Sequence, residues 1–293
     1  MISATVVALL HPGAMGASLG GALVRAGHEV RWLAEGRSAA TRARAEAAGL
    51  NPAASWAELL SGCEVVVAVC PPDAAAAVAG QFAAAAGPAG EKARIYVDAN
   101  AVSPRRAKEI AALVTPAGAN FVDSDIVGPP IGQGRTCLYL SGAHAGPVAA
   151  LFRPDDPLVV VLGDDPTAAS ALKMVYAGWT KATSALLLTL WAAAVRSGVA
   201  DALAAEWAAS QPDLAGRLQR AVATAVPKAW RFAGEMDEIT QTLADMGLPT
   251  GFHQAAAQLY RELDTFKDRP APTIEAVLAA LPAPPVDPAS SSS

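Results

Sequence analysis

The chain has 293 residues, which is enough for about two domains with sizeable cores. Its formal net charge is −5 and its Lys and Arg residues form no basic run, which argues against binding to nucleic acid or to an anionic membrane surface. The hydrophobic 53% is rich in alanine, which indicates helices and not membrane spans. The first residues lack the features of a signal peptide, so we expect a cytoplasmic protein.

The cysteines and histidines give no sign of a cross-link or a metal. Cys63, Cys70 and Cys137 are odd in number and show no C-x-x-C spacing, which argues against a disulfide framework and a structural zinc site. The four histidines form no pair at a ligand spacing on a helix. We therefore expect free thiols and no metal.

Residues 4–25 have the order strand, glycine turn, helix. The apolar run at 4–10 stops at a turn and a helical pattern begins at once. Gly13 would let the backbone approach a pyrophosphate, and Gly16 would let the helix pack closely against the strand, with its N-terminal N–H groups facing the anion. His11 replaces the first glycine of the G-x-G-x-x-G fingerprint, yet the context favours a dinucleotide site over a strand–turn–helix without ligand. The predicted cofactor contacts here are His11, Pro12, Gly13, Ala14, Met15 and Gly16.

A second strand, at 28–33, leads into the segment expected beside the adenosine ribose. Glu35 could accept a hydrogen bond from a 2′-hydroxyl, which favours NAD, whereas Arg37 and Ser38 could hold a 2′-phosphate, which favours NADP. Cys70 and Pro71, after the next strand, are also predicted cofactor contacts.

The rest of the chain divides into a sheet and a helical half. Apolar runs alternate with alanine-rich segments, which is typical of strands buried on both faces of a doubly wound, mostly parallel α/β sheet. Helical pattern then runs from 166 to about 263, with breaks at 211–212, 226–227 and 247–249. We predict seven or eight strands, including 65–69, 95–97, 120–122, 136–141 and 158–162, and domains at 1–165 and 166–281 with a disordered tail at 282–293.

One polar stripe lies on the helix predicted at 167–194. Its residues recur at three- and four-residue steps, and the alternative to a functional stripe is a solvated face. Residues 186–191 continue the helix with apolar side chains all round, which indicates burial. A buried lysine is costly unless it is paired or used. The stripe consists of Lys173, Tyr176, Thr180, Lys181 and Ser184.

Taken together, these parts resemble the β-hydroxyacid dehydrogenases, which include 3-hydroxyisobutyrate and 6-phosphogluconate dehydrogenases. Residues 2–16 look like that family's opening strand and G-x-G-x-M-G turn. Residues 97–104 are similar to its D-x-S/N-x-x-x-P segment, and residues 121–129 fall where it has a D-A-P-V-S-G-G substrate loop. Residues 230–239, with 247–249 and 260–261, look like a poorly characterised phosphogluconate-dehydrogenase-like branch.

The resemblance implies a Rossmann-type domain joined by a long interdomain helix to an all-α substrate and dimerisation domain. Lys173 lies at the position of the family's catalytic lysine, and Asn100 becomes a partner for the nicotinamide or the substrate. Gly36-Arg37-Ser38 looks like the Asn-Arg-Ser/Thr turn of NADP-dependent relatives, so we favour NADP over NAD. The predicted substrate contacts come from two places. The loop, with its backbone donors, provides Ser124, Asp125, Ile126, Val127 and Gly128, and the helix provides Trp179 and Lys181.

Three departures from the family pattern affect the expected substrate. Val127 replaces the serine of the family's substrate loop, and Pro129 replaces the second glycine of that loop. Ala177 replaces the asparagine that the family usually has four residues after the lysine. Polar contacts to a substrate carboxylate are therefore missing, which favours a bulkier or less polar substrate. Four tryptophans could line an aromatic pocket, although core packing is the commoner role: Trp179, Trp191, Trp207 and Trp230.

The expected reaction is hydride transfer between a nicotinamide and a hydroxyl or carbonyl carbon. Lys173 acts as the base if burial or the charge of Lys181 lowers its pKa, or it stays charged and polarises the oxygen while Tyr176 donates the proton. The alternatives are an imine reductase, a group that usually has Asp or Tyr at the lysine position, and a non-catalytic NADP-binding protein. The apolar helical half also predicts a homodimer through its helices.

Overall fold

The computed structural model describes residues 4–87, 94–267 and 269–282, and it divides into two compact units between Tyr176 and Ala177. This division falls inside helix α7 (Ala168–Arg196), later than the expected boundary at 165, because the first turns of α7 pack with the sheet. Of the predicted tail, all but Pro282 lies outside the described residues. Each unit is described by itself.

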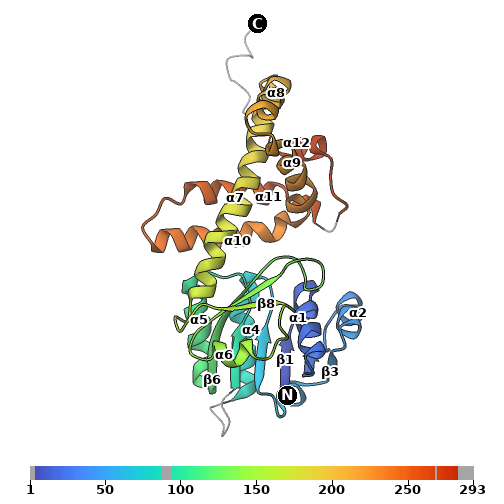
Figure 1. Ribbon diagram of the computed structural model, residues 1–293, viewed down its shortest axis with the longest axis vertical. Coiled ribbons are helices and arrows are strands. Elements are labelled where there is room, and N and C mark those ends of the chain that lie inside the picture. Colours follow the sequence, from blue (N-terminus) through green and yellow to red (C-terminus); the bar gives the residue numbers. More distant parts are fainter. Residues whose placement is uncertain (1–3, 88–93, 268, 283–293) are drawn as a thin grey trace. The chain divides into compact units, whose positions relative to one another are not determined.

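The first unit is built on an eight-stranded sheet in the order β3-β2-β1-β4-β5-β6-β7-β8 (Figure 1). Neighbouring strands are parallel except for β6 and β7, so the predicted doubly wound, mostly parallel sheet is confirmed. Sequence patterns missed β3, which is short, contains a proline and lies at the sheet edge, where a missing N–H is tolerated. The strands are β1 (Val6–Leu10), β2 (Glu29–Leu33), β3 (Asn51–Ala53), β4 (Val65–Ala68), β5 (Arg94–Asp98), β6 (Ala119–Val127), β7 (Cys137–Ser141) and β8 (Leu158–Val161).

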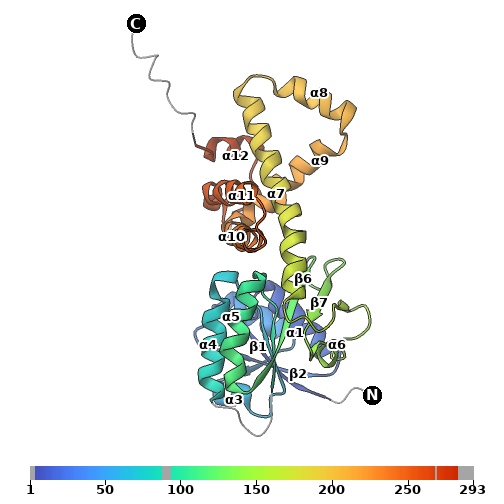
Figure 2. The same cartoon turned by 90° about the vertical axis from the view of Figure 1, so that its left-hand side faces the viewer.

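Helices cover both faces of this sheet (Figure 2). Alternate residues of each strand point to opposite faces, so Val7 and Leu9 join one core cluster while Ala8 and Leu10 join the other. The first cluster lies under α1 (Ala14–Arg25), α2 (Ala39–Ala47) and α6 (Ala145–Ala149), and the second under α3 (Trp56–Leu60), α4 (Ala75–Ala86) and α5 (Pro104–Val114). Short 3-10 turns follow at Pro72–Ala74 and Thr115–Ala117.

Strand β6 corrects the predicted substrate loop. The sequence predicted a strand only at 120–122, but β6 continues to Val127 because its second half pairs antiparallel with β7, from Asp123 opposite Ser141 to Val127 opposite Cys137. Residues 124–127 are therefore strand residues, and the loop begins only at Gly128. Gly128 has φ 130°, and a Cβ there would collide with the backbone of Arg135 and Thr136.

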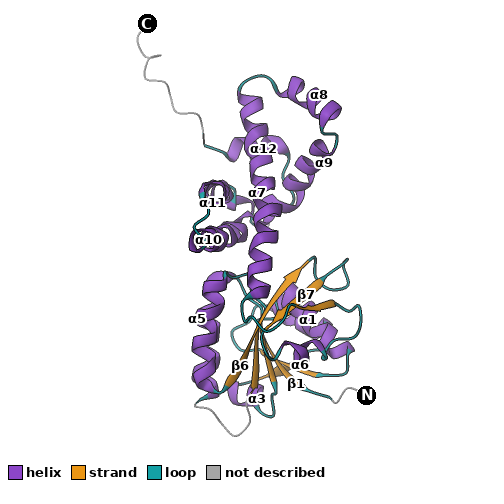
Figure 3. Cartoon of the chain, turned by 60° about the vertical axis from the view of Figure 1, so that its left-hand side comes forward, coloured by secondary structure: helices purple, strands orange, loops and turns teal. Residues whose placement is uncertain are grey.

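The second unit consists of helices (Figure 3). The predicted breaks at 211–212, 226–227 and 247–249 are confirmed, and a further break at 197–199 separates α7 from α8. Helices α10 and α11 pack together, with the rings of Phe232 and Tyr260 edge to face at 5.5 Å. The elements after α7 are α8 (Ala200–Ser210), α9 (Asp213–Arg220), a π-helical turn (Ala221–Ala225), α10 (Ala229–Asp245), α11 (Gly251–Glu262) and α12 (Ile274–Ala280), with 3-10 turns at Val226–Lys228 and Asp264–Phe266.

The described residues contain neither a membrane-spanning helix nor a cluster of metal-ligating side chains. No helix in this part of the chain has the length and hydropathy that a membrane crossing requires. The same residues contain no group of His, Cys, Asp and Glu side chains arranged to hold a metal ion.

The N-terminus of α7 is held by two buried side chains of the sheet. The Asp123 carboxylate accepts hydrogen bonds from the backbone N–H of Ser170 at 2.8 Å and from its hydroxyl at 2.6 Å. The Ser141 hydroxyl accepts a hydrogen bond from the backbone N–H of Ala169 at 3.0 Å. Sheet side chains thus bind N–H groups that have no partner inside the helix. Burial raises the pKa of Asp123 to about 7.

Asp123→Asn should remove part of the pH dependence of stability. Because the folded-state pKa lies above the ordinary value, ionisation of Asp123 opposes folding, so its effect destabilises the protein as pH rises from about 4 to about 7. Relative to Asp123→Asn, the wild type should lose a few kcal/mol over this window, at about 1.4 kcal/mol per unit of pKa shift. Urea unfolding at several pH values measures the difference. Parallel profiles for the two proteins would contradict the assignment.

Candidate functional site

Strand register brings most of the predicted site residues of the first unit to one edge of the sheet. Leu10 pairs with Ala68, Ala68 with Asp98, and Asp98 with Asp123, so these four residues lie at one level. The residues just beyond this level are His11 after β1, Cys70 after β4, Asn100 after β5 and Asp125 within β6. Ligands of open α/β sheets bind outside the carboxyl ends of the strands, which is this edge.

The turn after β1 keeps the shape of a glycine fingerprint although its first residue is histidine. His11 has φ 68°, the left-handed conformation that a glycine adopts easily, and its carbonyl accepts a hydrogen bond from Gly13 at 2.8 Å. A Cβ on Gly16 would lie 2.5 Å from that carbonyl oxygen, so Gly16 is required by the turn itself. A Cβ on Gly13 would meet no atom within 4 Å. The open space at Gly13 fits the close approach of a pyrophosphate.

Two side-chain nitrogens near this turn have no protein partner among the described residues. They are the buried His11 Nδ1 and the buried Arg37 Nε. Burial and the positive charge of Arg37 lower the pKa of His11 to about 4. Burial also lowers the pKa of Arg37. Glu35 is exposed, and the Ser38 hydroxyl caps α2 by accepting a hydrogen bond from the Thr41 N–H.

Asn100 ties the end of β5 to the segment after β4. Its side-chain oxygen accepts a hydrogen bond from the Cys70 N–H at 2.5 Å, and its amide nitrogen donates to Asp98. The side chain is buried, so it positions the backbone before Pro71; direct contact with a nicotinamide stays a prediction. Burial and the charges of Asp98 and Asp73 raise the pKa of the Cys70 thiol to about 12, which excludes a reactive thiolate at neutral pH.

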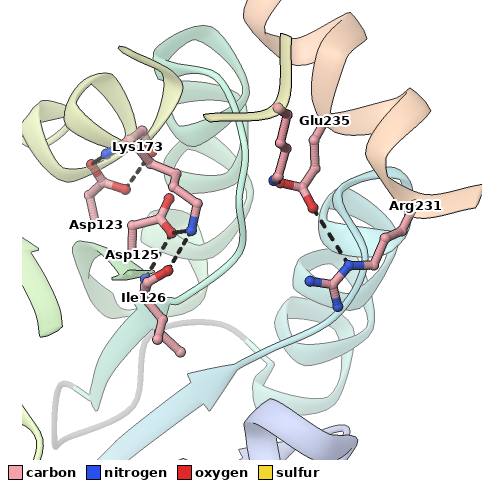
Figure 4. A network of polar contacts seen from close by, with 8 residues as sticks. Asp123, Asp125, Ile126, Lys173, Arg231 and Glu235 are labelled. Carbon is pink, nitrogen blue, oxygen red and sulfur yellow. Dashed lines mark hydrogen bonds and ion pairs between the residues drawn. The ribbon is translucent and has the colours of Figure 1, made fainter. Parts of the chain in front are cut away.

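Lys173 is largely buried and has a carboxylate partner, as the cost of burying a lysine requires. Its ammonium donates hydrogen bonds to the Asp125 carboxylate at 2.7 Å and to the Ile126 carbonyl at 2.5 Å (Figure 4). The same Asp125 oxygen accepts the backbone N–H of Ile126 at 2.8 Å. The side chains of Lys173 and Asp125 are 13% and 2% exposed. Asp125 was predicted as a substrate contact, and its role as the lysine's partner was missed.

A signal for that partner was present in the sequence. Asp125 occupies the position of the proline in the D-A-P-V-S-G-G pattern, so a carboxylate appears where relatives have an apolar ring. Two further carboxylates, of Asp98 and Asp123, are buried nearby. Burial and the neighbouring Asp123 raise the pKa of Asp98 well above its ordinary value. The Ser124 hydroxyl is also buried, with no hydrogen-bond partner among the described residues.

The second unit contains another buried ion pair. Lys181 contacts Glu235, whose other carboxylate oxygen lies 3.8 Å from Arg231 Nε (Figure 4). The Lys181 ammonium also lies 4.5 Å from the centroid of the Phe232 ring. Lys181, which was expected to act on Lys173 as a positive charge, therefore has a carboxylate of its own.

The exposed positions of the long helix differ from the expectation. Leu187 and Leu188 are buried, as expected for much of residues 186–191, whereas Leu186 and Leu190 are about half exposed in the single chain. Trp179 is exposed, whereas Trp191 and Trp207 pack together with ring centroids 5.8 Å apart. Trp230 lies under the Lys267 ammonium at 4.3 Å. Trp191 and Trp207 thus serve packing.

Two family models match the chain. Residues 7–149 match the NAD binding domain of 6-phosphogluconate dehydrogenase, and residues 194–263 match a domain of unknown function, DUF1932. The mostly parallel sheet, the glycine turn after β1 and the match at residues 7–149 together define a nicotinamide-nucleotide-binding α/β protein with a helical second half. The chain is similar to the β-hydroxyacid dehydrogenase superfamily of 6-phosphogluconate and 3-hydroxyisobutyrate dehydrogenase-like proteins.

Two relatives resemble the chain over more than half of its length. An uncharacterized 28.5 kDa protein of Methanothermus fervidus is 28% identical over 60% of this chain and 65% of its own length. A conserved protein of unknown function, with reported structural similarity to 3-hydroxyacid dehydrogenases, is 25% identical with a TM-score of 0.66, covering 89% of this chain and 97% of that one.

Two further solved structures show the same fold. The 3-hydroxyisobutyrate dehydrogenase of Mycobacterium tuberculosis is 20% identical with a TM-score of 0.70, covering 96% of this chain and 100% of that one. The reductive aminase of Aspergillus terreus is 19% identical with a TM-score of 0.55, covering 95% of this chain and 99% of that one.

Gly13→Ala and Gly16→Ala should separate binding from folding. Gly16→Ala forces the turn backbone to shift and should destabilise the protein by about 1–3 kcal/mol in urea unfolding. Gly13→Ala meets open space, so stability should change by less than about 1 kcal/mol while nucleotide affinity falls at least about tenfold, because the methyl group occupies the pyrophosphate's place. Undiminished nucleotide binding by Gly13→Ala would contradict the assigned site.

Proposed function

We propose that this protein is an NADP-dependent oxidoreductase acting on a hydroxyl or carbonyl substrate of the β-hydroxyacid class, with Lys173 at the reacting oxygen. The observation that carries the proposal is the anchored ammonium of Lys173. It comes from the first turns of α7 and meets β6 beyond the level at which β5 ends, on the same sheet edge as the glycine turn. When bound, the nicotinamide supplies or accepts the hydride.

The pairing of Lys173 favours one of the two roles considered for it. Asp125 balances the ammonium and, with the Ile126 carbonyl, directs it. A charged lysine held in this way acts as an electrostatic stabiliser of a developing oxyanion and donates a hydrogen bond to it. Tyr176, one turn further along α7 and half exposed, is then the proton donor to the oxygen. Asn100 acts as a positioning residue through the Cys70 backbone.

The cofactor proposal follows from the segment after β2. Arg37 offers a buried N–H that no other described residue binds, whereas Glu35 is exposed. A guanidinium suits a 2′-phosphate better than a 2′-hydroxyl, so this segment favours NADP over NAD.

The substrate proposal follows from the strand that replaces the expected loop. Val127 and Pro129 provide neither the hydroxyl nor the second N–H that would hold a carboxylate. A carboxylate with fewer donors binds more weakly, which supports a bulkier or less polar substrate. The same feature keeps a C=N substrate as the second candidate, in line with a fold shared by reductive aminases and imine reductases. The retained Lys173 favours the carbonyl substrate.

Lys173→Ala should abolish turnover without abolishing cofactor binding. NADPH consumption with a panel of β-keto acids, aldehydes and cyclic imines identifies the active class, and Lys173→Ala should lower that rate by about 100-fold or more. Because the substitution removes the counter-charge of the buried Asp125 carboxylate, a Lys173→Met, Asp125→Asn double variant that removes both charges is measured beside it. NADPH affinity verifies that each variant is folded. Unchanged turnover in folded variants would refute the role of Lys173.

We also propose a homodimer formed through the second unit. Large apolar side chains there are exposed in the single chain, including Trp179, Leu186, Leu190 and Phe252. Exposed apolar surface of this kind is uncommon in monomers. Light scattering at micromolar concentration should give the mass of two chains. Leu186→Glu with Leu190→Glu should give one chain, while Ala205→Glu, an added charge at an exposed position of α8, should not. A monomeric wild type would refute the proposal.

A further inference from the structure

We propose that His11 is a second cation for the 2′-phosphate of the nucleotide, and that it takes up a proton when a nucleotide carrying this phosphate binds. The inference rests on the proposed function, because it assumes an NADP site at the glycine turn. It assigns to His11 a role in cofactor specificity that the glycine of the usual fingerprint cannot have.

The first support is that the imidazole has no role in the fold that the structure reveals. His11 keeps a left-handed φ of 68°, which costs free energy for any residue other than glycine. Its Nδ1 is buried, yet it has no hydrogen-bond partner among the described residues. A strained backbone combined with an unsatisfied buried nitrogen is the pattern expected of a ligand-binding residue.

The second support is the position of Arg37. Strands β1 and β2 are neighbours in the sheet, with Leu9 opposite Trp32, so the residues after their ends share one side of the turn. Arg37 is close enough for its charge to act on the imidazole, and its own Nε is buried without a partner in the described part of the chain. The ribose of a dinucleotide lies between the first turn and the end of the second strand. Two buried nitrogens without a partner among the described residues therefore lie on the side of the turn where a 2′-phosphate would bind.

The third support is the charge around the imidazole. Without ligand, burial and Arg37 keep His11 neutral, with a pKa of about 4. The first turn of α1 carries no acidic residue, and Glu35 is exposed. A phosphate dianion would offset the charge of Arg37 and favour the imidazolium. One proton then passes from solvent to His11, the phosphate stays dianionic, and the ring N–H donates to a phosphate oxygen.

Calorimetric titration of the wild type with NADPH and NADH tests this inference without any substrate. The range from about pH 6.5 to about pH 8.5 keeps the free 2′-phosphate largely dianionic. Buffers of different ionisation enthalpy should reveal uptake of up to one proton per NADPH and none per NADH. NADPH affinity should fall as pH rises, while NADH affinity should stay nearly constant. Adenosine 2′,5′-bisphosphate and ADP, as fragments with and without the 2′-phosphate, should repeat the contrast.

Two variants isolate the imidazole. His11→Gly restores the fingerprint and accepts φ 68° without strain, and His11→Asn tolerates the left-handed backbone and keeps polar atoms that do not titrate near neutral pH. Both should lose proton uptake, and the ratio of NADPH to NADH affinity should fall about tenfold at the lower pH, the worth of one charge-assisted hydrogen bond.

The possible outcomes separate this inference from the proposed function. If the wild type binds NADPH without proton uptake, or if His11→Gly keeps both the preference and its pH slope, His11 has no such role, although the nucleotide site stands. If neither nucleotide binds, the proposed function and this inference both fail. Equal affinity for the two nucleotides in the wild type would overturn the inference and the preference for NADP, but not the nicotinamide site.

Discussion

The antiparallel pairing of β6 with β7 is the constraint on which the candidate site depends. It carries β6 past the level at which β1, β4 and β5 end, so that Asp123 lies at this level and Asp125 lies beyond it. Asp123 holds the first turn of α7 and Asp125 holds the ammonium of Lys173. A loop in the same place would leave these carboxylates to water, and neither contact would be fixed.

Burial makes these polar contacts strong and also makes them interdependent. Each carboxylate removed from water needs hydrogen-bond donors or a counter-charge, and α7 and neighbouring strands supply these groups. Asp98 illustrates the point, because its amide partner Asn100 also binds the Cys70 backbone, so one side chain joins the ends of β4 and β5. The site is therefore held by the rigid edge of a sheet, which suits chemistry that needs fixed geometry.

Sequence reasoning identified the elements whose signal is local. Apolar runs revealed seven of the eight strands, and the glycine turn was recognised from residues 11–16 even without its first glycine. It missed β3, whose three residues are too few for a period to appear. It ended β6 too early, because Asp123-Ser124-Asp125 is polar and its burial depends on β7 and α7, which are distant in the chain. The partner of Lys173 was missed for the same reason, since a pair 48 residues apart leaves no periodic trace.

The state of the three cysteines has a practical consequence. Burial raises the pKa of Cys63 and raises that of the partly buried Cys70 to about 12, so these two thiols are scarcely ionised at neutral pH, and Cys137 is buried away from reagents. Thiol-directed reagents attack the thiolate, so an added cysteine on the surface would react far ahead of the natural ones. Placed at the exposed Ala205 of α8, outside the predicted cofactor contacts, it would carry a single fluorophore while every other native residue is kept.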